Sequence, residues 1–400
     1  MRRMNVLFVN LVYGTGSTGK IIADIMNLMK KYGNNVKALY GTGACSHNAD
    51  AVKVSGKPEY YFHNAVSRFT DHAGLYSWAA TRKIIREIRA FQPDLIHLHT
   101  LHGFYVNYEM LFRFLKKASI PVVWTLHDCW AFTGHCTHFS QVKCMQWQTV
   151  CRDCKLLHRY PQCYWKGDVK RNFLRKRNAF TGVKNLTITT PSQWLANQVS
   201  QSFLRNYPRT VIPNGIDRTI FHPQSSCLRE KYHLADKKIV LGIANAWNAR
   251  KGLPDLLALA DRLGSDYQVV LIGLIEKQLP DIPPNVLGLL RTANQTELAQ
   301  WYSAADVFVN PTYEETFGLT TVEAQACGTP VVVYETDGCP ETVAPGNGRL
   351  VPQENMQALE NAVRDVADSN WRADPTKMVC FDKNTVYQGY IELYENILSA

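Results

Sequence analysis

Residues 307–334 read VFVNPTYEETFGLTTVEAQACGTPVVVY, and this stretch indicates the fold of the chain. Val307–Val309 and Val331–Tyr334 are short apolar runs, typical of strands that are buried on both faces of a parallel sheet. The segment between them is long enough for a helix, and Pro330 would prevent that helix from continuing. We therefore predict a strand–helix–strand unit, with residues 315–319 forming the loop at the carboxyl end of its first strand.

The same alternation recurs along the whole chain. Short runs rich in Val and Ile alternate with helix-length segments such as Thr18–Tyr32, and the series runs twice. This pattern predicts an α/β fold with two Rossmann-like, doubly wound parallel-sheet domains that face a central cleft. The expected strands are Val6–Val9, Val36–Tyr40, Leu95–His99, Val122–Trp124, Leu186–Thr189, Ile239–Ile243, Val269–Ile272, Val307–Val309 and Val331–Tyr334.

The domain boundaries follow from the interval between the two series. We expect an N-terminal domain over residues 1–207, with a cysteine-rich insertion at about residues 129–165, and a C-terminal domain over residues 208–383. The segment Val211–Asp217 would form the hinge between them. Residues 384–400 would form an amphipathic C-terminal helix.

The charge of the chain is unevenly distributed. The 400 residues are 46% hydrophobic and 20% charged, as in a globular protein with more than one core. Residues 1–200 hold 27 Lys and Arg against 10 Asp and Glu, whereas residues 201–400 hold 17 against 24. The basic half should meet an anionic partner, unless it is only a solvated surface. No apolar run reaches the ~18 residues of a spanning helix, so none is expected.

A glycine-rich segment near the N-terminus resembles two nucleotide-binding motifs without completing either. Residues 14–19 match G-x-G-x-x-G, but the following strand ends at Tyr40 without the carboxylate that a dinucleotide site needs. The segment also fails as a Walker A loop, because Ile21 follows Lys20 where a hydroxyl should bind magnesium. What remains is a helix N-terminus that can bind a phosphate.

Two carboxylates bracket the loop of the first-quoted stretch. Glu315 and Glu323 are eight residues apart, and carboxylates can accept hydrogen bonds from sugar hydroxyls. The amides of Phe317, Gly318 and Leu319 would open the helix and could bind a diphosphate. For either residue alone a simpler interpretation stays open, since Glu315 could be solvated and Glu323 could offset the helix dipole.

With this Glu-x7-Glu pair the chain resembles family 4 of the retaining glycosyltransferases, which have the two-domain GT-B fold. By this resemblance Glu315 contacts the donor sugar, Glu323 holds the ribose hydroxyls, and residues 316–319 bind the phosphates. The loop residues implied are Thr316, Phe317, Gly318 and Leu319. Further motifs extend the resemblance over nearly the whole chain: Pro191-Ser192-x-Trp194, Val211–Asp217, Lys251-Gly252 and Gly338-x-Pro340-Glu341.

The resemblance also implies residues on other loops. Lys251 and Arg250 would meet the diphosphate, although the family's usual arginine position falls on Ala246 here. The family's N-terminal glycine pair falls roughly on Gly16 and Ser17, which would help bind the donor.

Histidines follow two expected strands of the N-terminal half. In the family a histidine in the position of His127 lies near the donor sugar, and a buried core histidine is the alternative. His99 and His102 would line the acceptor side of the cleft.

The segment Trp124–Cys136 is similar to a subgroup that builds bacterial exopolysaccharide and O-antigen, the colanic-acid type. The resemblance implies transfer of a hexosyl unit, with retention and without a catalytic metal, from a UDP or GDP sugar to a glycan or a polyprenyl-diphosphate-linked acceptor. The N-terminal domain would bind the acceptor and the C-terminal domain the nucleotide sugar, with the last helix packing back onto the N-terminal domain. Such an enzyme would be cytoplasmic and peripheral on the inner face of the membrane.

Three alternatives stay open. The same fold could carry a nucleotide-sugar epimerase or hydrolase, or an inactive relative that serves as an assembly partner. A basic zinc protein that binds nucleic acid would leave the Glu315–Glu323 pair unexplained, so we expect no nucleic-acid partner.

Four cysteines lie within 19 residues: Cys136, Cys144, Cys151 and Cys154. Four thiolates could hold a structural zinc ion that stabilises the insertion, and free thiols are the alternative.

The basic segment that follows, residues 166–184, interleaves Lys and Arg with apolar residues at helical spacing. We expect either an interfacial helix on anionic lipid or a solvated helix docked on the core.

Overall fold

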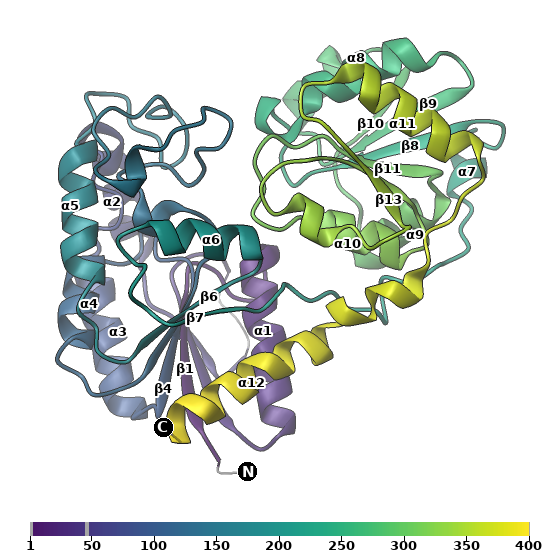
Figure 1. Cartoon of the computed structure of the whole chain (residues 1–400). Helices are drawn as coiled ribbons and strands as arrows, with labels where there is room; N and C mark the ends of the chain where they lie inside the picture. Colours follow the sequence, from purple (N-terminus) through teal and green to yellow (C-terminus); the bar gives the residue numbers. More distant parts are fainter. Residues whose placement is uncertain (1–2, 45–47, 400) are drawn as a thin grey trace. The chain divides into compact units, whose positions relative to one another are not determined.

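The computed structural model describes residues 3–44 and 48–399, which form two compact units (Figure 1). The N-terminal unit runs to Pro213 and includes the C-terminal segment from Tyr387 onward. The C-terminal unit spans Asn214–Val386. Each unit is built on a sheet whose described strand pairs are all parallel, with helices between the strands, and this confirms the predicted fold class.

The sheet of the N-terminal unit has seven strands in the order β3-β2-β1-β4-β5-β6-β7. The strand order reverses at β1, which pairs with β2 on one side and with β4 on the other. The carboxyl ends next to such a reversal are where doubly wound sheets bind ligands. The strands are β1 (Asn5–Asn10), β2 (Asn35–Tyr40), β3 (Ala51–Lys53), β4 (Leu95–Leu98), β5 (Val122–Thr125), β6 (Leu186–Thr190) and β7 (Arg209–Val211).

Helices cover both faces of this sheet. The helices are α1 (Gly16–Lys31), α2 (Lys57–Thr70), α3 (Trp78–Phe91), α4 (Tyr108–Leu115), α5 (Val169–Phe180), α6 (Gln193–Gln201) and α12 (Lys383–Ser399). Figure 1 shows α3, α4 and α5 on one side of the strands and α1 on the other. Helix α1 buries Ile21, Ile25 and Met29, which share one face at helical spacing.

The C-terminal unit has six strands in the order β10-β9-β8-β11-β12-β13, with the reversal at β8. Helices α8 and α11 cover one face of this sheet, and α9 and α10 cover the other (Figure 1). The strands are β8 (Lys238–Ile243), β9 (Tyr267–Ile272), β10 (Val286–Leu289), β11 (Val307–Asn310), β12 (Val331–Tyr334) and β13 (Gly348–Val351). The helices are α7 (Leu228–Lys231), α8 (Leu253–Leu263), α9 (Gln295–Ala304), α10 (Leu319–Ala326) and α11 (Met356–Asp368).

All of the predicted strands are present, and the four that the sequence analysis missed are the edge strands β3, β7, β10 and β13. Edge strands have a neighbour on one side only and are less covered by helices. No residue of β3 or β7 is fully buried, and β10 and β13 each bury one. Their sequences therefore lack the continuous apolar run that marks the central strands.

The C-terminal helix is held by buried tyrosines. From Tyr387 onward α12 belongs to the N-terminal unit. The hydroxyl of Tyr394 lies 2.6 Å from Nδ1 of His97, and that of Tyr390 lies 3.1 Å from Oγ1 of Thr125. These contacts attach the helix to residues of β4 and β5. None of the described helices is both long and apolar enough to cross a membrane.

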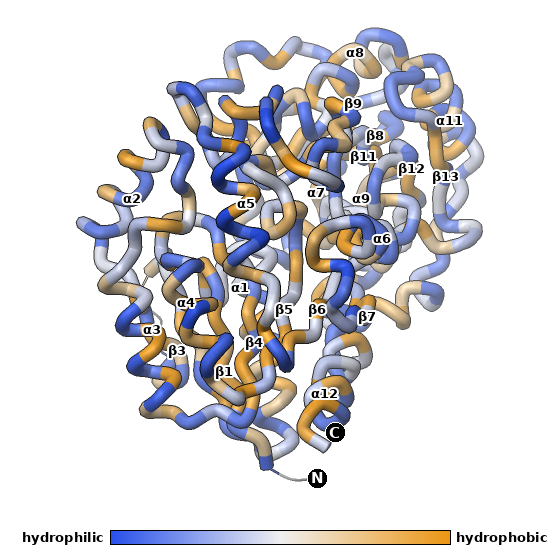
Figure 2. The backbone as a smooth tube through the Cα atoms, turned by 60° about the vertical axis from the view of Figure 1, so that its left-hand side comes forward, coloured by the Kyte–Doolittle hydropathy of each residue, from blue (hydrophilic) through white to orange (hydrophobic). Residues whose placement is uncertain are grey.

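The predicted helix in the basic segment is α5, but its apolar side does not face lipid. Val169, Phe173 and Phe180 are fully buried in the core of the N-terminal unit. The Phe180 ring packs on Phe112 and Trp124, with centroids 4.6 and 4.9 Å apart. Of the two expectations for this helix, the buried residues therefore support a solvated helix docked on the core, and insertion of its apolar side into lipid is wrong. Figure 2 shows α5 as a mostly hydrophilic segment, because its solvent side keeps the charged residues.

One lysine of α5 is buried as well. The Lys176 ammonium donates to the carbonyl oxygens of Trp130 (2.8 Å) and Thr133 (3.1 Å), and lies 3.7 Å from the Trp130 ring centroid. These contacts join α5 to the start of the insertion. Burial lowers the pKa of Lys176 from 10.5 to about 7.

Because the unfolded chain binds more protons than the folded one above pH 7, Lys176 makes stability increase with pH. We expect the free energy of unfolding in urea to rise between pH 7 and 8.5, by at most about 1.4 kcal/mol per pH unit from this group. Lys176→Met should lose this part of the pH dependence, and Lys170→Met, at an exposed neighbour, should keep it. Equal pH slopes for the two variants would contradict the assignment.

Candidate functional site

Two loops of the C-terminal unit bring a cation to a carboxylate. Lys251 follows β8 and Glu315 follows β11, and these strands are parallel neighbours at the point where the strand order reverses. The Lys251 ammonium forms an ion pair with Oε2 of Glu315. The side chains are 22% and 24% exposed, so both remain accessible to a ligand.

Close backbone packing holds the two loops together. Gly252 has φ of +75°, and a Cβ atom there would lie 2.2 Å from the carbonyl oxygen of Pro311. Arg250 donates to the carbonyl of Glu314 at 3.0 Å, and its own carbonyl accepts from the amide of Tyr313 at 2.8 Å. Arg250 therefore holds the loop after β11 in place, and this role does not depend on the expected contact of Arg250 with a diphosphate.

The predicted phosphate-binding loop leads directly into α10. Gly318 adopts φ of +95° immediately before the helix begins at Leu319. Thr316 and Phe317 are buried, and the Phe317 ring packs edge-on against Phe381 at 5.8 Å. Since the first amides of a helix have no acceptor within it, this N-terminus can bind an anion.

The second predicted carboxylate is positioned by α9. Glu323 lies on α10, and its Oε2 accepts a hydrogen bond from the Tyr302 hydroxyl at 2.9 Å. Tyr302 is fully buried, so this contact restricts where the carboxylate can point.

Two residues that were not predicted from the sequence, Tyr302 and Asp337, shape this region. Oδ2 of Asp337 accepts from the amide of Glu315 at 3.1 Å, and the amide of Gly338 donates to the carbonyl of Glu315 at 3.0 Å. These bonds fix the backbone of Glu315 from the loop after β12. Asp337 adjoins the quoted Gly338 motif and could have been included on that ground, whereas nothing in the sequence pairs Tyr302 with Glu323.

In the N-terminal unit the predicted residues follow β1, β4 and β5, which are neighbours around the reversal of strand order. Gly16 and Ser17 are exposed in the first turn of α1, after β1. Oδ1 of Asn10, the last residue of β1, accepts from the amide of Thr100 at 3.2 Å and ties this loop to the one after β4.

Two of the predicted histidines contact each other. His99 Nδ1 and His127 Nε2 are 3.0 Å apart, and the rings stack at 5.3 Å. Burial lowers the pKa of His127 to about 4, and it also lowers the pKa of His99 well below its usual value. Both imidazoles are therefore neutral at pH 7.

The third histidine is the centre of a polar chain that the sequence analysis did not predict. His102 Nε2 lies 2.7 Å from Oδ2 of Asp128, and its Nδ1 lies 2.9 Å from the hydroxyl of Tyr160. Burial raises the pKa of Asp128, but the charge and hydrogen bond of His102 outweigh burial and hold it at about 2. His99, His102, His127 and Asp128 line one small pocket. Asp128 directly follows His127 in sequence, whereas Tyr160 lies near the far end of the insertion, 58 residues from His102.

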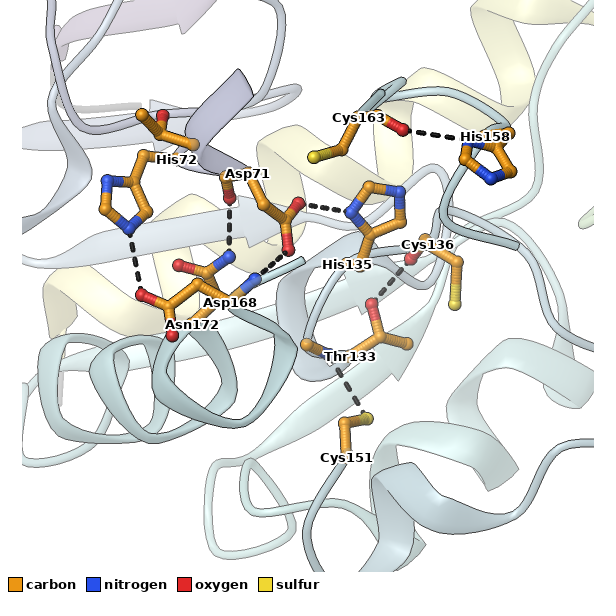
Figure 3. Close-up of polar contacts among 12 residues, drawn as sticks. Asp71, His72, Thr133, His135, Cys136, Cys151, His158, Cys163, Asp168 and Asn172 are labelled. Carbon is orange, nitrogen blue, oxygen red and sulfur yellow. Dashed lines mark hydrogen bonds and ion pairs between the residues drawn. The ribbon is translucent and has the colours of Figure 1, made fainter. Parts of the chain in front are cut away.

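The four cysteines of the predicted zinc site lie in that insertion. The Cys136 thiol is hydrogen-bonded to the sulfur of Cys154, which lowers the Cys154 pKa to about 6. Cys151, labelled in Figure 3, accepts through its sulfur from the amide of Gly134, the residue after the labelled Thr133, at 3.2 Å. Among residues 3–44 and 48–399, no group of three or more His, Cys, Asp or Glu side chains is arranged to hold a metal ion. The geometry thus adds no support for zinc, which stays a prediction.

Two family models match the chain. "Glycosyltransferase Family 4" matches residues 21–219, and "Glycosyl transferases group 1" matches residues 226–379. Together they cover most of both units.

Individual proteins show the same similarity. The colanic acid biosynthesis glycosyl transferase WcaC of Escherichia coli is 22% identical over 98% of this chain and 100% of its own length. A GDP-mannose-dependent alpha-(1-6)-phosphatidylinositol dimannoside mannosyltransferase of Mycobacterium tuberculosis is 29% identical over 39% of this chain and 43% of its own. The crystal structure of Anabaena HepE in complex with UDP-glucose covers 98% of this chain and 100% of its own, with a TM-score of 0.68 and 18% identity.

The two models and the full-length relative agree with the motifs around Glu315 and Glu323, and the structural similarity agrees with the two-unit architecture. The chain therefore belongs to the family 4 glycosyltransferases, which have the GT-B fold.

Proposed function

We propose that this glycosyltransferase moves a hexosyl unit from a nucleoside diphosphate sugar to a hydroxyl group of a glycan or a lipid-linked sugar, with retention at the anomeric carbon. The observation that carries the proposal is the Lys251–Glu315 ion pair beside the N-terminus of α10. One small region thereby offers a cation and helix amides for a diphosphate and a carboxylate for sugar hydroxyls.

The donor would replace contacts that the free protein makes internally. A diphosphate near α10 would attract the Lys251 ammonium, and the Glu315 carboxylate would then accept from hydroxyls of the sugar. Glu323, held by Tyr302, would accept from the ribose. Structures of HepE were determined with UDP and UDP-glucose, which supports a nucleotide sugar as donor and leaves UDP and GDP both open for this chain.

The reaction breaks the bond between the anomeric carbon and the phosphate oxygen and forms a bond to the acceptor oxygen. The acceptor proton passes to an oxygen of the leaving diphosphate. Since the leaving group becomes an anion, we expect Lys251, Arg250 and the α10 amides to supply most of the catalysis. A neutral His127 suits a position near the sugar, because a cationic imidazole would oppose the positive charge that develops on the ring.

The acceptor would bind at the N-terminal unit. The Asp128 carboxylate, oriented by His102, can accept hydrogen bonds from sugar hydroxyls at the same small pocket. The similarity to WcaC and to the mycobacterial mannosyltransferase supports a role in bacterial surface polysaccharide or glycolipid synthesis. We place the enzyme in the cytoplasm, at the inner face of the membrane that carries a lipid-linked acceptor.

The proposal is tested by product analysis with a panel of UDP and GDP sugars, with and without an acceptor. Transfer should require the acceptor, and without an acceptor the donor should stay intact. Epimerised or hydrolysed donor would support the alternative reactions.

Lys251→Ala should lower kcat by about 10²- to 10³-fold, because the leaving diphosphate loses its nearest cation. Lys277→Ala, at an exposed lysine of the same unit, should be unchanged. Full turnover by Lys251→Ala would refute the site.

The acceptor assignment is tested with Asp128→Asn, which keeps the shape of the side chain and removes its charge. We expect the KM for the acceptor to rise by about tenfold, since a charged hydrogen bond is lost, while the donor KM stays constant. Asp153→Asn, at an exposed position of the insertion, is the matched control. A change confined to the donor KM would place Asp128 on the donor side instead.

Because lysine, arginine and helix amides can neutralise the diphosphate, we expect full activity in the presence of EDTA. The same samples should be measured for metal content and thermal stability, so that loss of a structural zinc ion is recognised as unfolding. Activity that disappears while the fold is intact, and returns with Mg²⁺ or Mn²⁺, would contradict metal-independent catalysis.

A further inference from the structure

The outer face of α2 exposes an unusual number of aromatic side chains. The helix turns His63 and Ser67 into the core, and it leaves Tyr61 63%, Phe62 52% and Phe69 61% exposed. Positions 61, 62 and 69 lie on one side of a helix, so the three rings form a stripe. Large aromatic groups of this kind are normally buried, and a cluster of them in solvent marks a binding surface.

Neighbouring segments extend the stripe. Phe69 packs edge-on against Tyr164 of the insertion at 6.2 Å, and Trp165 beside it is 73% exposed. At the other end Phe62 contacts Tyr76 at 6.2 Å, and Tyr76 contacts the exposed Trp78 at 5.7 Å. We call the exposed set the α2 aromatic surface; it consists of Tyr61, Phe62, Phe69, Trp78, Tyr164 and Trp165.

The base of this surface is held by buried polar contacts. Asp71, which follows the last residue of α2, is hydrogen-bonded through Oδ1 to Nδ1 of the buried His135, and its Oδ2 accepts from the amide of Asp168 at 3.0 Å (Figure 3). Nδ2 of Asn172, on α5, donates to the Asp71 carbonyl at 2.5 Å, and His72 pairs with Asp168 at 3.0 Å. The rings of α2 and of the insertion therefore stand on a base that these two segments share with α5.

The segments that carry the surface are basic. Residues 57–70, 76–82 and 164–171 hold six Lys and Arg, and their only acidic residues are Glu59 and Asp168. Glu59 accepts from the amides of Ala79 and Ala80, and Asp168 pairs with His72, so both carboxylates are engaged within the protein. The basic residues are Lys57, Arg68, Arg82, Lys166, Lys170 and Arg171.

We propose that the α2 aromatic surface docks on an anionic lipid bilayer. Trp, Tyr and Phe favour the headgroup region of a membrane, and a surrounding ring of Lys and Arg is attracted by anionic headgroups. A second copy of this chain is the less favoured occupant, because a two-fold contact would oppose the same basic residues to each other. The membrane attachment that was expected of α5 is thus assigned to α2 and the insertion.

The docking surface is connected to the acceptor pocket within the same unit. Phe104 packs against Tyr60 of α2 at 6.1 Å and against Tyr160 at 6.4 Å, and Tyr160 is hydrogen-bonded to His102. If the proposed function holds, a protein docked through this surface keeps the His102–Asp128 pocket close to the headgroup of a lipid-linked acceptor. This second step rests on the proposed function, whereas the docking itself does not.

The experiment is co-sedimentation of the full chain with large unilamellar vesicles of phosphatidylcholine, with and without equal phosphatidylglycerol. We expect binding that requires phosphatidylglycerol and weakens with salt. The variant Phe62→Ser/Phe69→Ser/Trp165→Ser should bind at least tenfold more weakly, because three rings no longer enter the interface. Tyr32→Ser/Met145→Ser, which removes two exposed apolar side chains of the same unit outside this surface, should bind like the wild type.

A second measurement does not depend on the stability of the triple variant. Brominated lipids should quench tryptophan fluorescence of the wild type, and Trp165→Phe should be quenched clearly less. Undiminished sedimentation of a folded triple variant, or equal quenching of Trp165→Phe and the wild type, would overturn the proposal. Vesicle binding that does not depend on phosphatidylglycerol would also overturn the proposal. The same holds if the triple variant changes its oligomeric state but binds vesicles like the wild type.

Turnover of a water-soluble acceptor separates this proposal from the proposed function. The triple variant should retain it and lose activity only on acceptor embedded in vesicles. If the wild type binds vesicles as expected but transfers no sugar to any acceptor, the proposed function fails and the docking surface stands.

Discussion

The parallel pairing of β8 with β11 is the constraint on which the Lys251–Glu315 site depends. It places the loops that follow both strands at one edge of the sheet, so that Lys251 meets Glu315 although 64 residues separate them. Gly252 allows the closest approach of these loops, since any side chain there would collide with Pro311. The loop after β12 then fixes the Glu315 backbone through Asp337. An isolated pair of exposed charges would contribute little, but here the backbone determines the positions of both.

In the N-terminal unit, burial determines the chemistry of the same sheet edge. His99 and His127 are held neutral by desolvation, whereas Asp128 stays ionised because His102 is within hydrogen-bond distance. Two neutral imidazoles therefore lie within a few ångströms of an ionised carboxylate. The C-terminal helix reaches the buried side of this cluster through the contact of Tyr394 with His97.

The cysteine-rich insertion has a role in this unit that does not depend on whether it binds zinc. It is anchored by the Asp71–His135 pair and by Lys176, both of which are buried. From this base it contributes Tyr160, which is hydrogen-bonded to His102 beside the pocket, and Tyr164 and Trp165 of the α2 aromatic surface. One inserted segment thus joins the pocket to the surface that we propose meets the membrane.

The sequence by itself determined the fold class, the central strands and the family, because buried parallel strands and the Glu-x7-Glu motif are local patterns. It also placed Lys251, Glu315 and His127 on loops at strand ends, where the structure finds them. It missed the edge strands, whose composition is mixed because they are partly exposed. Helices α2 and α5 both carry apolar stripes, so the sequence cannot tell which stripe is buried. Only the tertiary structure decided that Phe173 and Phe180 of α5 face the core while Phe62 and Phe69 of α2 face solvent. The partners Tyr160 and Tyr302 were likewise beyond the sequence, because they reach His102 and Glu323 from other elements and spacing along the chain does not encode such contacts.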